Sequence, residues 1–229
     1  MRIGLIGAGN MARALARGLG GPVLVSDHGS GRAAALAAEL GGEAASSADV
    51  AAAADVVVLC HKPAGLAEVA GEIRPRAVAS VLASTPLADL RAAYPGVPVV
   101  RLMPNLPVEV RRGVFCLAAE EPGERELAER LRPLFAPLGM VVDVADHLVD
   151  AAMAVVGCGT GFLTVVAEAQ ADSAVRQGLP APVARELAVA GMGGAADLLR
   201  ARGGDTAAVR RDVTSPGGST ARGLAALER

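Results

Sequence analysis

Short apolar runs separated by amphipathic stretches make up the chain as far as Val144. The runs are continuous and rich in Val and Leu, which is typical of strands buried on both faces of a parallel sheet. Between them, apolar residues recur at the spacing of a helix that covers a sheet. Strands are predicted near the chain start and at 22–26, 55–60, 77–82, 97–102, 114–118 and 140–144, and helices after the first strand, at 32–40 and 124–134, and from near 47 and 63. This alternation predicts an α/β fold with a doubly wound sheet.

Beyond Val144 the pattern changes, and no later stretch has the character of a strand. Asp146 is placed to cap a long helix of small and apolar residues, a second helix is predicted over 182–202, and a last one over 221–228. We therefore predict two domains, 1–148 and 149–229. About eighty residues in two or three helices bury little apolar surface by themselves. The second domain is expected to complete its core against another subunit.

The first apolar run ends in a glycine-spaced turn, Gly7-Ala8-Gly9-Asn10-Met11-Ala12, that leads into a helix. With this G-x-G-x-x-A spacing, Gly7 permits the tight turn, Gly9 lets a pyrophosphate approach the backbone, and Ala12 lets the helix settle on the strand. The phosphates would bind free N–H groups at the helix start. A chain rich in Ala and Gly produces such spacings by chance, as plain structural turns. The position after a strand and before a helix nevertheless favours a Rossmann-like dinucleotide-binding domain over 1–148.

The end of the second predicted strand bears on which dinucleotide is bound. Asp27 is placed to accept a hydrogen bond from an adenosine ribose hydroxyl, which favours NAD. The following Ser30 and Arg32 are placed to bind a ribose phosphate instead, which favours NADP. Both interpretations stay open, and our hypothesis is NADPH as cofactor with NADH tolerated.

Two further strand ends carry polar residues, and ligands of open parallel sheets bind beyond the carboxyl ends of the strands. The run 55–60 leads into His61-Lys62-Pro63, where Lys62 is the only lysine of the chain and Pro63 suits the first turn of a helix. Lys62 is a candidate contact for the cofactor or a substrate anion, with a solvated loop lysine as the alternative. His61 has no evident partner. Asn105, in a proline-flanked loop, suits a nicotinamide carboxamide or nearby backbone, or stabilises its own turn.

The amino-acid composition bears on which partners and which location the chain can have. The chain has 52% hydrophobic residues, a net charge of -2, 2% aromatic residues and no basic block, which gives little support to a nucleic-acid surface. An odd number of cysteines and the absence of a signal pattern favour a reducing, cytoplasmic location. The uncharged stretch 151–167 is interrupted by glycines and is predicted as a buried interface helix rather than a membrane span. No metal site is predicted.

A second glycine-rich turn stands near the end of the chain, at 213–220, with the sequence Val-Thr-Ser-Pro-Gly-Gly-Ser-Thr. Its glycines expose consecutive backbone N–H groups, and the helix that follows adds its dipole. The turn therefore suits an anion such as a carboxylate. A generic capping turn also contains Ser and Thr, but it does not usually need Ser215-Pro216-Gly217-Gly218 as well.

With these motifs the chain resembles the pyrroline-5-carboxylate reductase family. The resemblance covers nearly the whole chain and is carried by the opening turn, Lys62-Pro63, the 101–107 segment (Arg-x-Met-Pro-Asn-x-Pro), the 168–179 segment and the 213–220 turn. It implies reduction of the cyclic imine 1-pyrroline-5-carboxylate to L-proline with NADPH, the last step of proline biosynthesis. It also implies a helical domain that interleaves with its twin in a homodimer, often within larger assemblies of dimers.

The resemblance also implies roles for single residues. Gly7, Gly9, Asn10 and Met11 look like the family's cofactor loop, and Lys62 and Asn105 match family positions beside the cofactor. Independently of the resemblance, Asp27 at its strand end and Pro63 beside Lys62 are further candidate cofactor contacts. The substrate loop comprises Ser215, Gly217, Gly218, Ser219 and Thr220. Thr220 is the nearest credible donor to the imine nitrogen and is our candidate catalytic residue. Because its hydroxyl is a weak acid, we expect it to relay a proton from water or to position an already protonated ring.

Three alternatives stay open. A hydroxy-acid dehydrogenase of the same two-domain plan would resemble relatives that use a lysine in the second domain, and no lysine follows Lys62. A reductase of a different cyclic imino acid is motivated by Gly157-Cys158-Gly159-Thr160-Gly161, where the family usually has Gly-Ser-Gly-Pro-Ala. A non-catalytic nucleotide-sensing module would bind the cofactor without oxidising it, and the intact turn at 215–220 argues against it.

Overall fold

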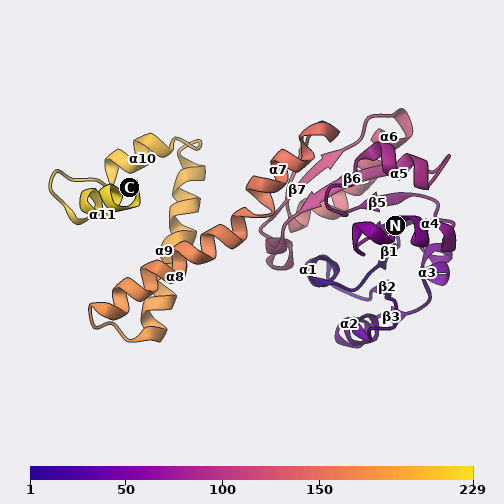
Figure 1. Ribbon diagram of the computed structural model, residues 1–229, viewed down its shortest axis with the longest axis horizontal. Coiled ribbons are helices and arrows are strands. Elements are labelled where there is room, and N and C mark those ends of the chain that lie inside the picture. Colours follow the sequence, from indigo (N-terminus) through magenta and orange to yellow (C-terminus); the bar gives the residue numbers. More distant parts are fainter. Residues whose placement is uncertain (229) are drawn as a thin grey trace. The chain divides into compact units, whose positions relative to one another are not determined.

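The computed structural model describes residues 1–228, which Figure 1 shows as a ribbon. The chain divides into two compact units, of which the first runs from Met1 to Gly161 and the second begins at Phe162. The first contains a sheet covered by helices, and the second is helical in its described part. The functional boundary predicted near residue 148 stays a prediction, because compactness does not identify the segment that binds a second subunit.

One eight-stranded sheet forms the centre of the first unit, with the order β3-β2-β1-β4-β5-β6-β7-β8. The chain starts in the middle of the sheet and builds outward on one side and then the other, so the strand order reverses between β1 and β4. The strands are β1 Ile3–Ile6, β2 Leu24–Ser26, β3 Glu43–Ala44, β4 Val56–Leu59, β5 Val78–Ser80, β6 Val99–Pro104, β7 Gly113–Ala118 and β8 Gly139–Asp143. The predicted strands are confirmed, and the short edge strand β3 is an addition.

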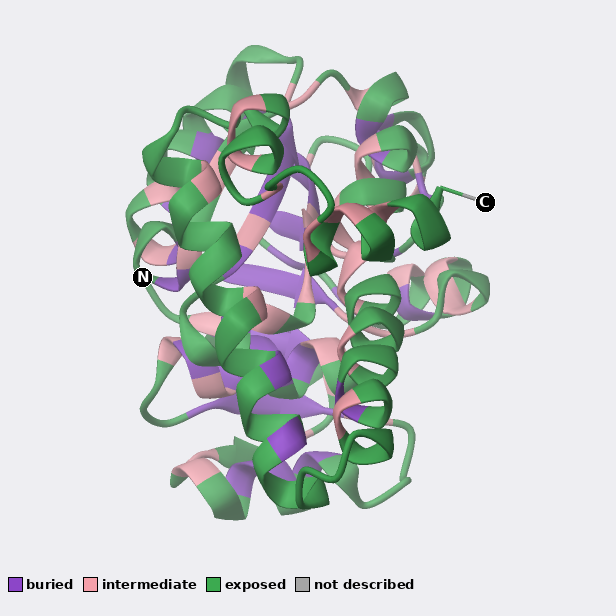
Figure 2. Ribbon diagram, turned by 90° about the vertical axis from the view of Figure 1, so that its left-hand side faces the viewer, coloured by how far each residue is buried: buried purple, intermediate pink, exposed green. Residues whose placement is uncertain are grey.

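Helices cover both faces of the sheet. Along β4, Val56 and Val58 pack in a core with residues of α1, α2 and α6, whereas Val57 and Leu59 pack in a second core with residues of α3, α4 and α5. Because both faces are covered, the strand is an unbroken apolar run, and Figure 2 shows the strands as mainly buried. The helices are α1 Asn10–Leu19, α2 Arg32–Leu40, α3 Ser47–Ala53, α4 Leu66–Glu72, α5 Leu87–Ala93 and α6 Pro122–Phe135, with the short 3-10 helices η1 Pro63–Gly65, η2 Leu106–Val110 and η3 Ala136–Leu138.

Strand β7 departs from the predicted alternation. It runs antiparallel to β6, with Leu102 opposite Leu117 and Met103 opposite Cys116. Only a loop containing η2 joins the two strands, whereas a parallel pair needs a crossover of about a dozen residues or more. Strict strand–helix alternation through Val144 is therefore wrong at this point, and the sheet is mixed.

The last part of the chain is helical as predicted, but it contains five α-helices in the described residues instead of two or three. Asp146 does not cap a long helix, because it lies within the 3-10 helix η4 and its carboxylate binds other partners. The elements after β8 are η4 Asp146–Leu148, α7 Val149–Val156, α8 Gly159–Arg176, α9 Ala181–Ala201, α10 Thr206–Asp212 and α11 Ser219–Leu227.

A buried arginine attaches the start of α7 to the sheet. The Arg101 side chain, 4% exposed, places Nη1 3.0 Å from Oδ1 of Asp146 and Nη2 2.5 Å from Oδ1 of Asp150. The other carboxylate oxygen of Asp146 accepts a hydrogen bond from the Leu87 N–H at 3.1 Å. These contacts tie β6, α5 and α7 together.

Replacing this arginine is expected to destabilise the first unit. Arg101→Met should lower the free energy of unfolding by about 3 kcal/mol, because Asp146 would remain largely buried without its partner. Arg200→Met is the matched control, since Arg200 is 72% exposed and its only ion pair among residues 1–228 is with Asp197 in the same helix. Its effect should stay below about 0.5 kcal/mol. Urea unfolding curves measure both, and equal losses would contradict a special role for Arg101.

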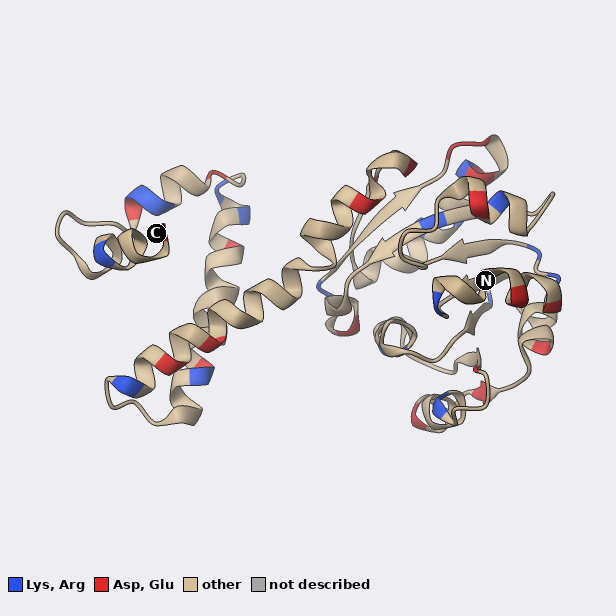
Figure 3. Ribbon diagram, viewed as in Figure 1, with Lys and Arg blue, Asp and Glu red and all other residues tan. Residues whose placement is uncertain are grey.

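The segment Asp146–Arg176, which contains α7 and α8, is long and apolar enough to cross a membrane by length and composition alone. Within one chain it is largely uncovered, since Phe162 and Val165 are 66% and 63% exposed. Charged residues gather toward the end of α8 (Figure 3), where Glu168 and Arg176 are exposed. An apolar surface of this size is expected to be covered in an assembly. The predicted burial of 151–167 therefore concerns the assembly and not the single chain.

Candidate functional site

The turn after β1 has the geometry that its glycines predict. Gly7 adopts φ +104°, and a Cβ there would lie 2.6 Å from the Cys60 carbonyl carbon. Its N–H donates to the Ser26 carbonyl at 2.9 Å, so the turn is fixed between the ends of β2 and β4. Only glycine is accommodated at this point without strain.

Gly9 and the start of α1 leave room for an anion. Gly9 is the N-cap of α1, and a Cβ on it would meet no atom within 4 Å. No side chain caps the helix, and its first turn contains no acidic residue. The exposed Asn10 and half-buried Met11 begin the helix, while Ala12 is fully buried. Free N–H groups and the helix dipole at an uncrowded backbone fit the pyrophosphate of a dinucleotide.

The loop between β2 and α2 uses its own polar groups. Asp27 accepts hydrogen bonds from the Gly29 N–H at 3.0 Å, the Ser30 hydroxyl at 2.6 Å and the Ala33 N–H at 2.9 Å. These bonds, that from Ser30 most strongly, hold the pKa of Asp27 below its usual value, so its carboxylate is ionised at neutral pH. Both Asp27 and Ser30 thus order the loop, and Arg32 is left with an exposed side chain. A cofactor contact from Asp27 stays a prediction.

The end of β4 places three residues beside the Gly7 turn. Lys62 is exposed and forms the N-cap of η1, and Pro63 occupies the first position of that helix, as predicted. Burial lowers the pKa of His61, so its ring is neutral at pH 7. Its Nδ1 lies 2.8 Å from the Lys62 carbonyl oxygen, which places the ring proton on Nδ1, and its buried Nε2 has no hydrogen-bond partner among residues 1–228. The exposed Lys62 side chain makes no hydrogen bond or ion pair among residues 1–228, so a ligand contact from Lys62 stays a prediction.

Asn105 is engaged on both sides of its amide. Its Oδ1 accepts from the Val114 N–H at 2.8 Å, and its Nδ2 donates to the Val156 carbonyl at 3.3 Å. It therefore links the start of β7 to the last residue of α7. These partners lie 9 and 51 residues away in the sequence, so the side chain does not stabilise the turn that contains Asn105. Its contact with a nicotinamide stays a prediction.

The second glycine-rich turn connects α10 to α11 within the second unit. Gly217 adopts φ +69°, and a Cβ on Gly218 would collide with the Ser215 hydroxyl. Gly218 is the N-cap of α11, which has neither a side-chain cap nor an acidic residue in its first turn. Ser219 and Thr220 begin this helix, and both are exposed. The arrangement repeats that of the first turn and suits a small anion.

The sequence patterns did not identify the loop after β5 as part of a functional site. Strand β5 ends at the same edge of the sheet as β1 and β4. Within the loop Ser84 is exposed and adopts φ +50°, which is unusual for a residue other than glycine. The residue type does not reveal the positive φ of Ser84, because serine is common in loops. The sequence indicates this loop only through its position after the end of a predicted strand.

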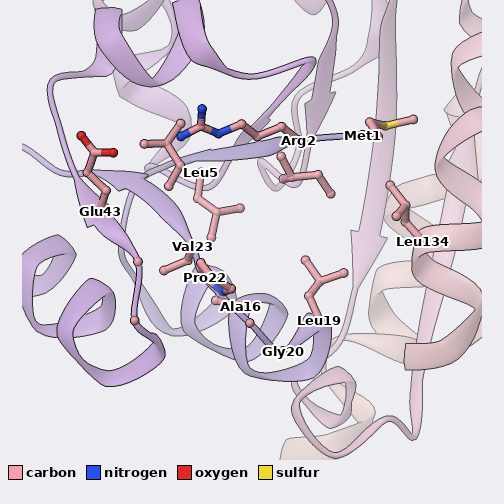
Figure 4. Close-up of a pocket in the computed structure, with 15 residues that line it drawn as sticks. Met1, Arg2, Leu5, Ala16, Leu19, Gly20, Pro22, Val23, Glu43 and Leu134 are labelled. Carbon is pink, nitrogen blue, oxygen red and sulfur yellow. The ribbon is translucent and has the colours of Figure 1, made fainter.

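A large cavity lies at the opposite edge. It has a volume of about 870 Å³ and lies where β1 and β2 begin, between the side chains of Arg2 and Glu43 and those of Leu19 and Leu134 (Figure 4). Ligands of open parallel sheets bind beyond the carboxyl ends of the strands. The candidate site is therefore at the Gly7 edge and not in this cavity.

Comparison with known proteins relates the chain to families of reductases. Residues 146–229 match the family described as pyrroline-5-carboxylate reductase dimerisation, and residues 2–85 match NADP oxidoreductase, coenzyme F420-dependent. Pyrroline-5-carboxylate reductase 3 of Mus musculus is 32% identical over 244 residues, covering 100% of this chain and 88% of that protein. Pyrroline-5-carboxylate reductase of Pseudomonas aeruginosa is 34% identical over 234 residues, covering 96% and 85%.

Solved structures give the same result. The 1-pyrroline-5-carboxylate reductase of Streptococcus pyogenes superposes with a TM-score of 0.91 at 27% identity, covering 100% of this chain and 91% of that chain. The pyrroline carboxylate reductase of Plasmodium falciparum, solved with NADP bound, superposes with a TM-score of 0.86 at 23% identity, covering 100% and 89%. The second likeness concerns the fold alone.

Proposed function

The chain belongs to the pyrroline-5-carboxylate reductase family, and from this we propose that it reduces 1-pyrroline-5-carboxylate to L-proline, the last step of proline biosynthesis. NADPH is the proposed cofactor, with NADH accepted as well. The observation that carries the proposal is the presence of two uncapped helix starts behind glycine turns, at Gly9 and Gly218. One suits a diphosphate and the other a small carboxylate.

Each group of residues has its own role in the proposed reaction. NADPH supplies the hydride when it is bound. The N–H groups at the start of α1 hold the pyrophosphate, and those of 217–220 hold the substrate carboxylate. Orienting two reactants in this way lowers the barrier by several kcal/mol. Thr220 stands beside the imine nitrogen, where it relays a proton from water or positions the protonated ring.

We further propose that two chains form a homodimer through 149–229. Residues 146–229 match a dimerisation family, and the exposed apolar side chains of α8 need a cover. A second copy supplies a matching apolar surface, because a twofold interface is self-complementary. Larger assemblies of dimers and a cytoplasmic location are part of the same proposal.

An assay of the purified full chain tests the function. Oxidation of NADPH is followed by loss of its near-ultraviolet absorbance, with 1-pyrroline-5-carboxylate as substrate and a panel of cyclic imines of other ring sizes beside it. Catalytic efficiency highest for 1-pyrroline-5-carboxylate is the expected result. Another imine ranking far ahead would favour the alternative of a reductase that acts on a different cyclic imino acid in specialised metabolism, which the exposed Cys158 and the neighbouring Thr160 motivate. No oxidation with any imine would leave a nucleotide-sensing module.

The preference for NADPH is expected to depend on Arg32. Arg32 is the exposed first residue of α2, next to the β2–α2 loop in which Asp27 and Ser30 bind each other. Arg32→Ala should lower kcat/KM for NADPH by about 10- to 100-fold, the scale of one charge-assisted hydrogen bond to a phosphate. The efficiency with NADH, which lacks the ribose phosphate, should stay within about 2-fold. Equal losses with both cofactors would show that Arg32 does not bind the ribose phosphate of NADPH.

A further inference from the structure

Ser84 has a backbone conformation that its side chain disfavours. It adopts φ +50°, and the only other non-glycine residue with positive φ among residues 1–228 is Arg111. For L-residues this left-handed region brings Cβ too close to the backbone, so glycine is the residue expected there. Strained residues of this kind persist only where the surroundings fix them, and they cluster at ligand sites.

The loop around Ser84 is fixed on both sides. The Leu82 N–H donates to the Ser80 hydroxyl at 3.3 Å, and the Thr85 hydroxyl donates to the Ala83 carbonyl at 3.1 Å. Beyond the loop, the Leu87 N–H is bound by Asp146. Leu82 and Thr85 are 3% and 4% exposed, so both are anchored in the core.

Ser84 itself is exposed between these anchors. Its hydroxyl makes no hydrogen bond within the part of the chain that the structure describes. The protein therefore holds a serine, in a strained conformation, with its hydroxyl available at the surface. Arg111 differs, because its side chain binds the Gly18 carbonyl at 3.1 Å, which accounts for its position.

The topology places the Ser84 loop at the edge of the sheet where one half of a dinucleotide is expected to bind. The register aligns Ile6 of β1 with Leu59 of β4, and Leu59 with Ser80 of β5, so these three strands end at one level. A dinucleotide crosses the point where the strand order reverses, between β1 and β4. The adenosine half of the dinucleotide is expected toward β2, because the acidic residue that binds the adenosine ribose follows β2. The nicotinamide half is therefore expected toward β4, β5 and β6. Ser84 follows β5, on the nicotinamide side.

We propose that Ser84 is a positioning residue of the proposed NADPH site, whose hydroxyl hydrogen-bonds to the nicotinamide carboxamide. A hydroxyl both donates and accepts, and the carboxamide offers an N–H and a carbonyl, so the two groups are complementary. The fixed backbone keeps the hydroxyl in place before the cofactor arrives, which reduces the entropy lost on binding. This inference rests on the proposed function only in that the chain binds a nicotinamide dinucleotide.

Two variants distinguish the effect of the Ser84 hydroxyl on NADPH binding from the effect of the strained backbone on stability. Ser84→Ala removes the hydroxyl and keeps the unfavourable φ, and Ser84→Gly removes both. The dissociation constant is measured by fluorescence titration for NADPH and by calorimetry for 2′,5′-ADP, which has the adenosine half without the nicotinamide. Both variants should raise the constant for NADPH by about 3- to 10-fold, the value of one hydrogen bond. Neither should change the constant for 2′,5′-ADP, and Ser84→Gly should have a higher Tm than Ser84→Ala.

The outcomes are distinct. An unchanged NADPH constant in Ser84→Ala, or an equal rise for 2′,5′-ADP, would overturn the assignment of Ser84 to the nicotinamide. NADPH binding by the unaltered chain without reduction of 1-pyrroline-5-carboxylate would overturn the proposed function and leave the Ser84 comparison valid. An unaltered chain that does not bind NADPH would overturn both.

Discussion

Thr220→Val is expected to lower the turnover number by about 10- to 1000-fold, the scale of losing one positioned hydrogen-bond or proton-transfer group. Valine keeps the branched shape of threonine and removes only the hydroxyl. Thr220 is the second residue of α11 and is exposed, so the substitution leaves no buried polar group without a partner. The loss should appear in kcat, because the hydroxyl acts mainly in the transition state. Steady-state kinetics with 1-pyrroline-5-carboxylate measure it.

Thr206→Val is the matched control for this variant. Thr206 is the exposed first residue of α10, so the same change is made in the first turn of a neighbouring helix. Its turnover should equal that of the unaltered protein. If Thr220→Val folds and retains full turnover, Thr220 has no part in the mechanism.

Replacing the two glycines of the first turn by alanine is expected to have different effects, on stability at Gly7 and on NADPH binding at Gly9. Gly7→Ala should lower the free energy of unfolding by about 3 kcal/mol or more, because it combines a positive φ with a Cβ 2.6 Å from the Cys60 backbone. Gly9→Ala should leave stability within about 0.5 kcal/mol, since its Cβ meets no atom within 4 Å. That methyl group instead occupies the space through which a pyrophosphate approaches. It should weaken NADPH binding by about 10-fold or more, as expected when several phosphate hydrogen bonds are lengthened.

Thermal unfolding and fluorescence titration of NADPH distinguish these effects. Gly223→Ala in α11 is the control for both, because a Cβ on Gly223 also meets nothing within 4 Å and lies outside both turns. It should leave NADPH binding unchanged and should not lower the unfolding temperature, because alanine is favoured over glycine inside a helix. Tight NADPH binding by Gly9→Ala would show that the phosphates do not lie against this turn.

The first unit was predictable because its signals are local. A strand buried on both faces must be apolar throughout, so the run that forms β4 was visible before any contact was known. Gly7 was predictable for a similar reason, since the turn needs a positive φ that only glycine adopts without strain.

Partners distant in sequence were not predictable. Asp146 has the character of a helix cap, but Arg101 and Leu87 bind its carboxylate. Asn105 was expected beside a nicotinamide, and its amide binds Val114 and Val156. Each side chain has several chemically equivalent uses, and only the packing of the elements selects one.

The sequence by itself therefore determined the strands of the sheet apart from β3, the two glycine turns and the family, because each depends on residues that are close together in the chain. The tertiary structure alone decided the antiparallel β7, the anchoring of α7 by Arg101 and the strained loop at Ser84. These depend on which segments meet in space. That choice minimises the free energy of the whole molecule, and no short stretch of sequence contains it.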